Sequence, residues 1–170
     1  DDDLEGDGIV GISGIDTRAL TRRIREVGAM RAGIFSGDDA ALDAAEQLAR
    51  VTAAPEMTGQ NLSARVSVEA GEVVHAEGEP IGKLAIIDLG IKAATVRALA
   101  ERGFEVHVLP QSTTIDELRA LDPVAVFYSN GPGDPAASET HVELLRAVLA
   151  DKTPFFGICF GNQLLGRALG

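Results

Sequence analysis

The sequence contains one cysteine, Cys159, which stands between two glycines in the pentapeptide GICFG. A short apolar run precedes this pentapeptide and polar residues follow it. The spacing Gly-x-Cys-x-Gly is typical of a nucleophile elbow, in which a buried strand turns sharply into a helix and exposes the nucleophile. Glycine suits both flanking positions, because side chains there would collide where strand and helix cross. The first turn of a helix over residues 162–169 would direct N–H groups at Cys159 and favour its thiolate.

A lone cysteine after an apolar strand can also be a small hydrophobic core residue. A second loop favours the chemical interpretation. The segment SNGPGDP, residues 129–135, also follows an apolar run, so that two loops could meet beside Cys159. Together, GICFGNQ and SNGPGDP resemble the class I glutamine amidotransferases, whose pattern around the nucleophile is Gly-[Ile/Val]-Cys-x-Gly-x-Gln.

The elements that position these loops begin at residue 84. Continuous apolar runs, typical of strands covered on both faces, lie at residues 84–87, 104–109, 124–128 and 155–158. Helical patterns lie between them, at residues 91–102, 114–121 and 138–150. Repeated strand–helix units predict an α/β fold with a parallel sheet, in which ligands bind outside the carboxyl ends of the strands. Both loops fall at that edge, and the resemblance implies a flavodoxin-like amidotransferase domain.

Residues 1–66 precede this pattern and indicate a small α+β domain. Strands are expected at residues 9–12, 30–35 and 61–68, and helices at residues 16–28 and 38–50. Residues 67–83 are rich in Gly, Glu and Pro, which indicates a linker that could hold a hairpin. The predicted organisation is the carboxyl-terminal part of a first domain over 1–66, a linker over 67–83, and the amino-terminal half of an amidotransferase domain over 84–170.

Composition excludes several classes of function. The chain has 170 residues, of which 45% are hydrophobic, enough for one good core or two small ones. Its net charge of -11 disfavours nucleic acid and anionic membranes as partners. A single cysteine permits no internal disulfide, which fits the cytoplasm. The first residue is not Met and the last helical pattern is short, so we expect a piece of a longer chain.

Segments of the first domain indicate which class I amidotransferases this chain resembles most. The runs GIDTRALTR, from Gly14, and GAMRAG, from Gly28, are similar to the amino-terminal domain of the small, glutamine-hydrolysing subunits of carbamoyl-phosphate synthases. The run DLGIK from Asp88, followed by Arg97 and Leu99, resembles the same family's Asp-x-Gly-x-Lys-x-x-x-x-Arg-x-Leu pattern. The resemblance therefore covers nearly the whole chain.

The resemblance implies that Cys159 attacks L-glutamine and forms a glutamyl thioester with release of ammonia. It assigns Gly131, Gly133, Phe160 and Gln163 to glutamine binding. The backbone N–H groups of Gly133 and Phe160 would be the oxyanion donors. It implies no cofactor and no metal in this chain. The implied partner is a large synthetase subunit, in a heterodimer or higher oligomer, which uses ATP, Mg and bicarbonate to make carbamoyl phosphate for arginine and pyrimidine synthesis.

The chain departs from the family pattern in two ways. The commoner elbow reads GICLGHQ, so Phe160 replaces Leu and Asn162 replaces a titratable His beside the nucleophile. The family's catalytic His and Glu lie well downstream of the cysteine, whereas all three histidines of this chain precede it. They are His75, His107 and His141. We expect structural or surface roles for them, a general base beyond Gly170, and an inactive enzyme if residues 1–170 stand alone.

Two alternatives stay open. One is another amidotransferase of the same class, serving GMP, CTP, anthranilate or aminodeoxychorismate synthesis, although residues 1–66 argue against it. The other is a non-catalytic, flavodoxin-like binding module in which Cys159 is only structural. The reactivity of the thiol distinguishes this module from an enzyme.

Overall fold

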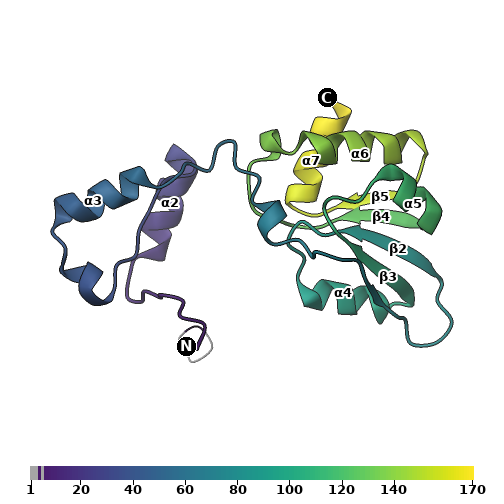
Figure 1. Ribbon diagram of the computed structural model, residues 1–170, viewed down its shortest axis with the longest axis horizontal. Helices are drawn as coiled ribbons and strands as arrows, with labels where there is room; N and C mark the ends of the chain where they lie inside the picture. Colours follow the sequence, from purple (N-terminus) through teal and green to yellow (C-terminus); the bar gives the residue numbers. More distant parts are fainter. Residues whose placement is uncertain (1–3, 5) are drawn as a thin grey trace. The chain divides into compact units, whose positions relative to one another are not determined.

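The computed structural model describes residue 4 and residues 6–170, and the chain divides into two compact units. The first unit ends at Met57, and the second covers Thr58–Gly170. Both predicted loops belong to the second unit, which holds the sheet in Figure 1. The candidate site can therefore be described within one unit.

Two α-helices and a short 3-10 helix form most of the regular structure in the first unit. They are α2 (Thr17–Val27), η1 (Gly37–Ala41) and α3 (Ala44–Ala53). The Asp16 carboxylate accepts a hydrogen bond from the Ala19 N–H (2.9 Å), and Gly28 at φ 82° ends α2. Both predicted helices are confirmed, although the second begins at Ala44 because Asp43 caps it.

The strands predicted at residues 9–12, 30–35 and 61–68 are wrong. Apolar side chains in the first two runs stay exposed, with 54% of Ile9 and 51% of Ile34 accessible. A strand needs a hydrogen-bonded neighbour, and none of these runs pairs with a described residue in a sheet. The third run instead contains a 3-10 helix, η2 (Ser63–Arg65).

The second unit is built on a five-stranded sheet with the order β1-β3-β2-β4-β5. The strands are β1 (Glu72–Val74), β2 (Gly82–Ile87), β3 (Phe104–Leu109), β4 (Ala125–Tyr128) and β5 (Phe155–Gly157). β2 pairs in parallel with β3 and β4, and β4 pairs in parallel with β5. The predicted α/β class with a mainly parallel sheet is confirmed.

The segment predicted as a linker, residues 67–83, contributes the edge strand β1 to this sheet. Val73 lies opposite His107 in an antiparallel pair with β3. The residues before β1 are also tied to the sheet, because the Val68 N–H donates to the carboxylate of Asp88, the residue that follows β2 (2.8 Å). The boundary between the two compact units thus falls between residues 57 and 58, upstream of the predicted linker. The assignment of 1–66, 67–83 and 84–170 as domains of a larger protein stays a prediction.

Helices cover both faces of the sheet (Figure 1). One face carries α4 (Ala93–Ala100), and the other carries α5 (Ile115–Leu121), α6 (Glu139–Ala150) and α7 (Phe160–Leu169). Successive residues of β2 enter the two cores in turn: Leu84 and Ile86 pack with α4, while Ala85 and Ile87 pack on the opposite side. This two-sided burial explains the continuous apolar runs. No described helix is long and apolar enough to cross a membrane.

Candidate active site at the carboxyl edge of the sheet

Cys159 lies at the bend between β5 and α7. β5 ends at Gly157 and α7 begins at Phe160, so only Ile158 and Cys159 make the turn. Cys159 has φ 52° and ψ −107°, a conformation that a residue with a side chain rarely adopts, and it is exposed. The strand, turn and helix of the predicted elbow are therefore present, with backbone strain at the nucleophile position.

The glycines of the elbow are required by contacts with the backbone. A Cβ atom on Gly161 would stand 2.3 Å from the carbonyl oxygen of Tyr128. A Cβ atom on Gly157 would stand 2.7 Å from the carbonyl carbon of Gly161. Both distances are far shorter than van der Waals contact, so the steric role predicted for these glycines is confirmed.

The loop of residues 129–135 lies beside the elbow, because β4 and β5 are parallel neighbours. The Ile158 N–H donates to the Tyr128 carbonyl (3.1 Å) and so joins the end of β4 to the turn. The Ser129 hydroxyl accepts a hydrogen bond from the Leu89 N–H (2.9 Å), which ties the same loop to the end of β2. The two predicted loops therefore meet at one edge of the sheet.

Gly131 and Gly133 lie within this loop, and internal contacts explain why neither has a side chain. A Cβ atom on Gly131 would stand 2.1 Å from the Leu89 carbonyl oxygen. Gly133 has φ 110°, and its Cβ atom would stand 2.9 Å from the Gln60 carbonyl oxygen. Close approach of a substrate amide is therefore not needed to explain these glycines. Their assignment to glutamine binding stays a prediction.

Phe160 and Gln163 lie in the first turn of α7. Phe160 offers the site a backbone N–H, and Gln163 offers it a polar side chain. The Phe160 ring is buried in the core (2% exposed), so only its backbone can serve the site. As the first residue of the helix, Phe160 has an N–H without an intrahelical acceptor. The Gln163 side chain is exposed, and the backbone N–H of Gln163 donates to the Cys159 carbonyl (3.0 Å). A backbone N–H and a polar side chain thus lie within one turn of Cys159, and the assignment of Phe160 and Gln163 to glutamine binding stays a prediction.

His141 belongs to the core and not to the site. It lies on α6 with 2% of its surface exposed, and neither ring nitrogen makes a hydrogen bond to a described residue. Burial lowers the pKa of His141, and the nearby Gln111 backbone opposes this shift only in part. The ring is therefore held neutral. The expected structural role of this histidine fits its enclosure.

His107 and His75 both lie next to the carboxylate of Glu105 on β3. The His107 Nε2 atom lies 2.7 Å from Oε1 of Glu105, and the His75 Nδ1 atom lies 3.6 Å from Oε2. The hydrogen bond with His107 lowers the pKa of Glu105. β2 and β4 separate β3 from β5, which puts β3 about 14 Å from β5 at the usual strand spacing of about 4.8 Å. These two histidines therefore lie apart from Cys159.

The segment just after the first unit reaches the site, which sequence reasoning missed. The Asp134 carboxylate accepts a hydrogen bond from the Gly59 N–H (2.8 Å), and the Asp134 N–H donates to the Gln60 carbonyl (2.9 Å). The first of these bonds joins residues 75 positions apart. No local pattern in the sequence signals such a contact.

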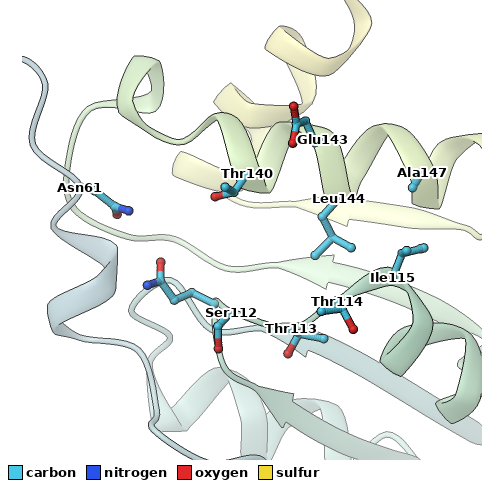
Figure 2. Close-up of a pocket in the computed structure, with 10 residues that line it drawn as sticks. Asn61, Ser112, Thr113, Thr114, Ile115, Thr140, Glu143, Leu144 and Ala147 are labelled. Carbon is cyan, nitrogen blue, oxygen red and sulfur yellow. The ribbon is translucent and has the colours of Figure 1, made fainter.

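A separate cavity of about 570 Å³ lies between α6 and the loop that follows β3 (Figure 2). Its polar lining includes Ser112, Thr113, Thr114, Thr140 and Glu143. None of its lining residues belongs to the elbow or to the loop of residues 129–135. Across the described chain, no group of three or more His, Cys, Asp or Glu is placed to hold a metal ion.

Comparison with known families agrees with this geometry. Residues 85–170 match the family described as Glutamine amidotransferase class-I, a stretch that includes both loops of the site. The chain belongs to the class I glutamine amidotransferase family. Residues 1–34 of this amidotransferase match a second family, described as Carbamoyl-phosphate synthase small chain, CPSase domain.

Several curated relatives of this amidotransferase carry the name carbamoyl phosphate synthase small chain. The Streptomyces avermitilis protein is 57% identical over 170 residues, which are 100% of this chain and 44% of that protein. The Corynebacterium efficiens protein is 50% identical over 169 residues, 99% of this chain and 42% of that protein. The Mycobacterium tuberculosis protein is 50% identical over 173 residues, 100% of this chain and 46% of that protein. The chain thus spans less than half the length of these relatives.

A solved structure of a GMP synthase subunit from Thermoplasma acidophilum is also similar. It aligns with 52% of this chain and 45% of its own, with a TM-score of 0.44 and 24% sequence identity.

Proposed function

We propose that this amidotransferase chain is part of the glutamine-hydrolysing small subunit of a carbamoyl-phosphate synthase. The observation that carries the proposal is an elbow cysteine at φ 52° in the same chain as a segment, residues 1–34, that matches carbamoyl-phosphate synthase small chains. The named relatives support it, because their similarity extends over both units. A single cysteine, which permits no internal disulfide, supports a cytoplasmic location.

In the proposed reaction, the Cys159 thiolate attacks the carboxamide carbon of glutamine, and the π electrons of the C=O bond move to oxygen. The N–H groups of Gly133 and Phe160 would donate to this oxyanion, while Gly131 and Gln163 help to hold the substrate. The C–N bond then breaks, the nitrogen takes a proton and leaves as ammonia, and a glutamyl thioester remains. Water adds to the thioester carbon, and cleavage of the C–S bond gives glutamate and the thiolate.

The proton transfers in both steps need a general base, and we propose that it lies outside residues 1–170. His141 is enclosed in the core, and His107 is paired with Glu105 on a strand distant from β5. The His and Glu that the family resemblance implies would complete the site. Ammonia would then pass to a large synthetase subunit, which uses bicarbonate, ATP and Mg, so that this chain needs no cofactor of its own.

The Cys159→Ser substitution tests this proposal in the complete protein bound to its large subunit. We expect glutamine-dependent carbamoyl phosphate formation to disappear and ammonia-dependent formation to continue, because free ammonia bypasses the glutaminase step. Both rates are measured on the same preparation, with the wild-type complex as control. Loss of both activities would contradict the assignment of Cys159 to glutamine hydrolysis alone.

A partner exchange separates this proposal from other amidotransferases of the same class. The complete protein should support carbamoyl phosphate formation with the large subunit from its own genome. It should not support GMP or anthranilate formation with the corresponding synthases. The reverse pattern would refute the proposed partner while leaving the glutaminase reaction intact.

A further inference from the structure

Arg167 stands at the opposite end of α7 from Cys159 and reaches the loop that follows β4. One guanidinium nitrogen, Nη1, donates a hydrogen bond to the carbonyl oxygen of Pro135. The other, Nη2, donates to Oε2 of Glu139 at the start of α6 (2.8 Å). Pro135 follows Gly133 by two residues. One side chain therefore connects the helix of the nucleophile to the loop that carries the second proposed oxyanion donor.

The helical repeat explains why Arg167 lies at this place. Phe160, Leu164 and Arg167 are spaced by four and three residues, so they share one face of α7. Phe160 (2% exposed) and Leu164 (0% exposed) are buried in the core with α6. Arg167 continues this face as far as the 3-10 helix η3 (Pro135–Ala137). The apolar residues fix α7 against the core, and the arginine fixes it against the loop.

The loop is also held from its other side through Asp134. The carboxylate of Asp134 accepts hydrogen bonds from the N–H groups of Gly59 and Ala136, both at 2.8 Å. These two bonds, together with the positive charge of Arg167, hold the pKa of Asp134 below its ordinary value. The carboxylate is therefore ionised at neutral pH. Residues 134 and 135 are clamped between the segment around Gly59 and the end of α7.

We propose that Arg167 is a positioning residue for glutamine hydrolysis, which holds the N–H donors of Gly133 and Phe160 at the separation that the oxyanion needs. This inference rests on the proposed function. The two donors belong to different elements, and Arg167 joins those elements directly. The pair of Arg167 and Glu139 is partly exposed (35% and 53% of the side chains), so it adds little to the free energy of unfolding. We therefore expect the loss of Arg167 to change the kcat of glutamine hydrolysis more than the stability of the protein.

The test measures glutaminase kinetics of the complete protein in its complex, with Arg167→Met as the main variant. We expect kcat to fall about tenfold while KM changes little, a smaller loss than the roughly 10²–10³-fold that follows outright removal of an oxyanion donor. Arg119→Met is the matched control, because Arg119 forms a comparable surface pair with Asp151 (2.7 Å) between other elements. It should leave kcat unchanged.

Two further variants separate the loop contact from the ion pair. Glu139→Gln keeps the bond from Arg167 to Pro135, and it should retain most of the wild-type kcat. Arg167→Lys keeps the positive charge, but a single ammonium group replaces the two guanidinium nitrogens that bind Pro135 and Glu139. Its kcat should therefore lie between those of the wild type and Arg167→Met. If Arg167→Met does not fold, the comparison of these two variants decides the question.

Alkylation of Cys159 by iodoacetamide distinguishes a positioning role of Arg167 from a merely structural one. General damage to the fold would change the alkylation rate as well as kcat. The reaction needs the thiolate but no oxyanion hole, so its rate should be the same in the wild type, Arg167→Met and Arg167→Lys. Wild-type kcat in both Arg167 variants would overturn the inference, and so would equal losses of kcat and alkylation rate. Absence of glutaminase activity in the wild-type complex would overturn the proposed function itself, and this inference with it.

Discussion

Cys159 and Gly161 lie two residues apart in the elbow. The first has a side chain in a strained backbone conformation, and the second has no room for a side chain. Cys159 carries a side chain at φ 52°, a strained conformation that costs on the order of 1–3 kcal/mol and that the surrounding packing must offset. Gly161 supplies part of that packing, because its backbone lies against the Tyr128 carbonyl with no room for a Cβ atom. The geometry of the elbow therefore depends on one residue that tolerates strain and one that lacks a side chain.

Gly161→Ala should destabilise the complete protein by about 1–3 kcal/mol, because the new methyl group forces a shift of the backbone at the crossing of β4 and α7. Urea denaturation monitored by circular dichroism measures the change. Gly166→Ala is the matched control in the same helix, since a Cβ atom there would meet no described atom within 4 Å beyond its chain neighbours and the nearby backbone of its own helix. That change should stabilise the protein by about 0.5–1 kcal/mol through helix propensity. Equal effects of the two substitutions would contradict the steric explanation.

At the scale of elements, α5 shows how a short helix is held beside the cavity of Figure 2. It has seven residues and begins with a capping box. The Thr114 hydroxyl accepts a hydrogen bond from the Glu117 N–H (3.3 Å), and the Glu117 carboxylate accepts one from the Thr114 N–H (2.7 Å). The backbone bond from Thr114 is the main cause that lowers the pKa of Glu117. The ionised carboxylate thus helps to start the helix.

Thr114→Ala should destabilise the complete protein by about 1 kcal/mol at pH 7 through loss of the cap. Because the pKa of Glu117 is lower in the folded state, its contribution is present above the ordinary glutamate pKa of about 4.3 and is lost as pH falls through the folded value. The hydroxyl of Thr114 also donates to that carboxylate, so the penalty should be smaller at pH 3 than at pH 7.

Urea denaturation at the two pH values measures this difference. Thr113→Ala is the control, since the neighbouring Thr113 side chain takes no part in the capping box. A penalty for Thr114→Ala that does not change with pH would show that the carboxylate bonds contribute nothing to the cap.

At the scale of the whole molecule, the two units match different families. The first contains the segment that matches carbamoyl-phosphate synthase small chains, and the second contains the amidotransferase elbow. Glutamine hydrolysis by itself has no chemical need for the first unit. If the proposed function holds, we expect that unit to serve the assembly with the proposed large subunit.

A chain of residues 1–170 on its own should hydrolyse glutamine negligibly even when folded. A positioned general base typically contributes about 10²–10⁴-fold, and none of the three histidines of this chain is placed for that role beside Cys159. Ammonia release is measured for this fragment and for the complete protein, and circular dichroism checks that the fragment is folded. Full activity of the fragment would show that one of the three histidines reaches the site.

The sequence by itself determined the features that depend on short stretches of chain. The spacing around Cys159 predicted a sharp strand-to-helix turn, because the crossing of β5 and α7 imposes its steric demands within five residues. The apolar runs predicted the parallel strands, because burial on both faces removes the alternation of polar and apolar residues. The caps at Asp16 and Thr114 also depend on a short stretch of chain, because each side chain accepts its hydrogen bond from a backbone N–H three residues ahead.

Only the tertiary structure decided the features that need a distant partner. Residues 9–12 and 30–35 have strand-like patterns, but no strand among the described residues pairs with them, whereas β1 forms in a polar segment because β3 offers an edge. The bond between Gly59 and Asp134 spans 75 positions, and that between Arg167 and Pro135 spans 32. Such contacts depend on how the chain returns to the same edge of the sheet, and local residue patterns carry no information about that return.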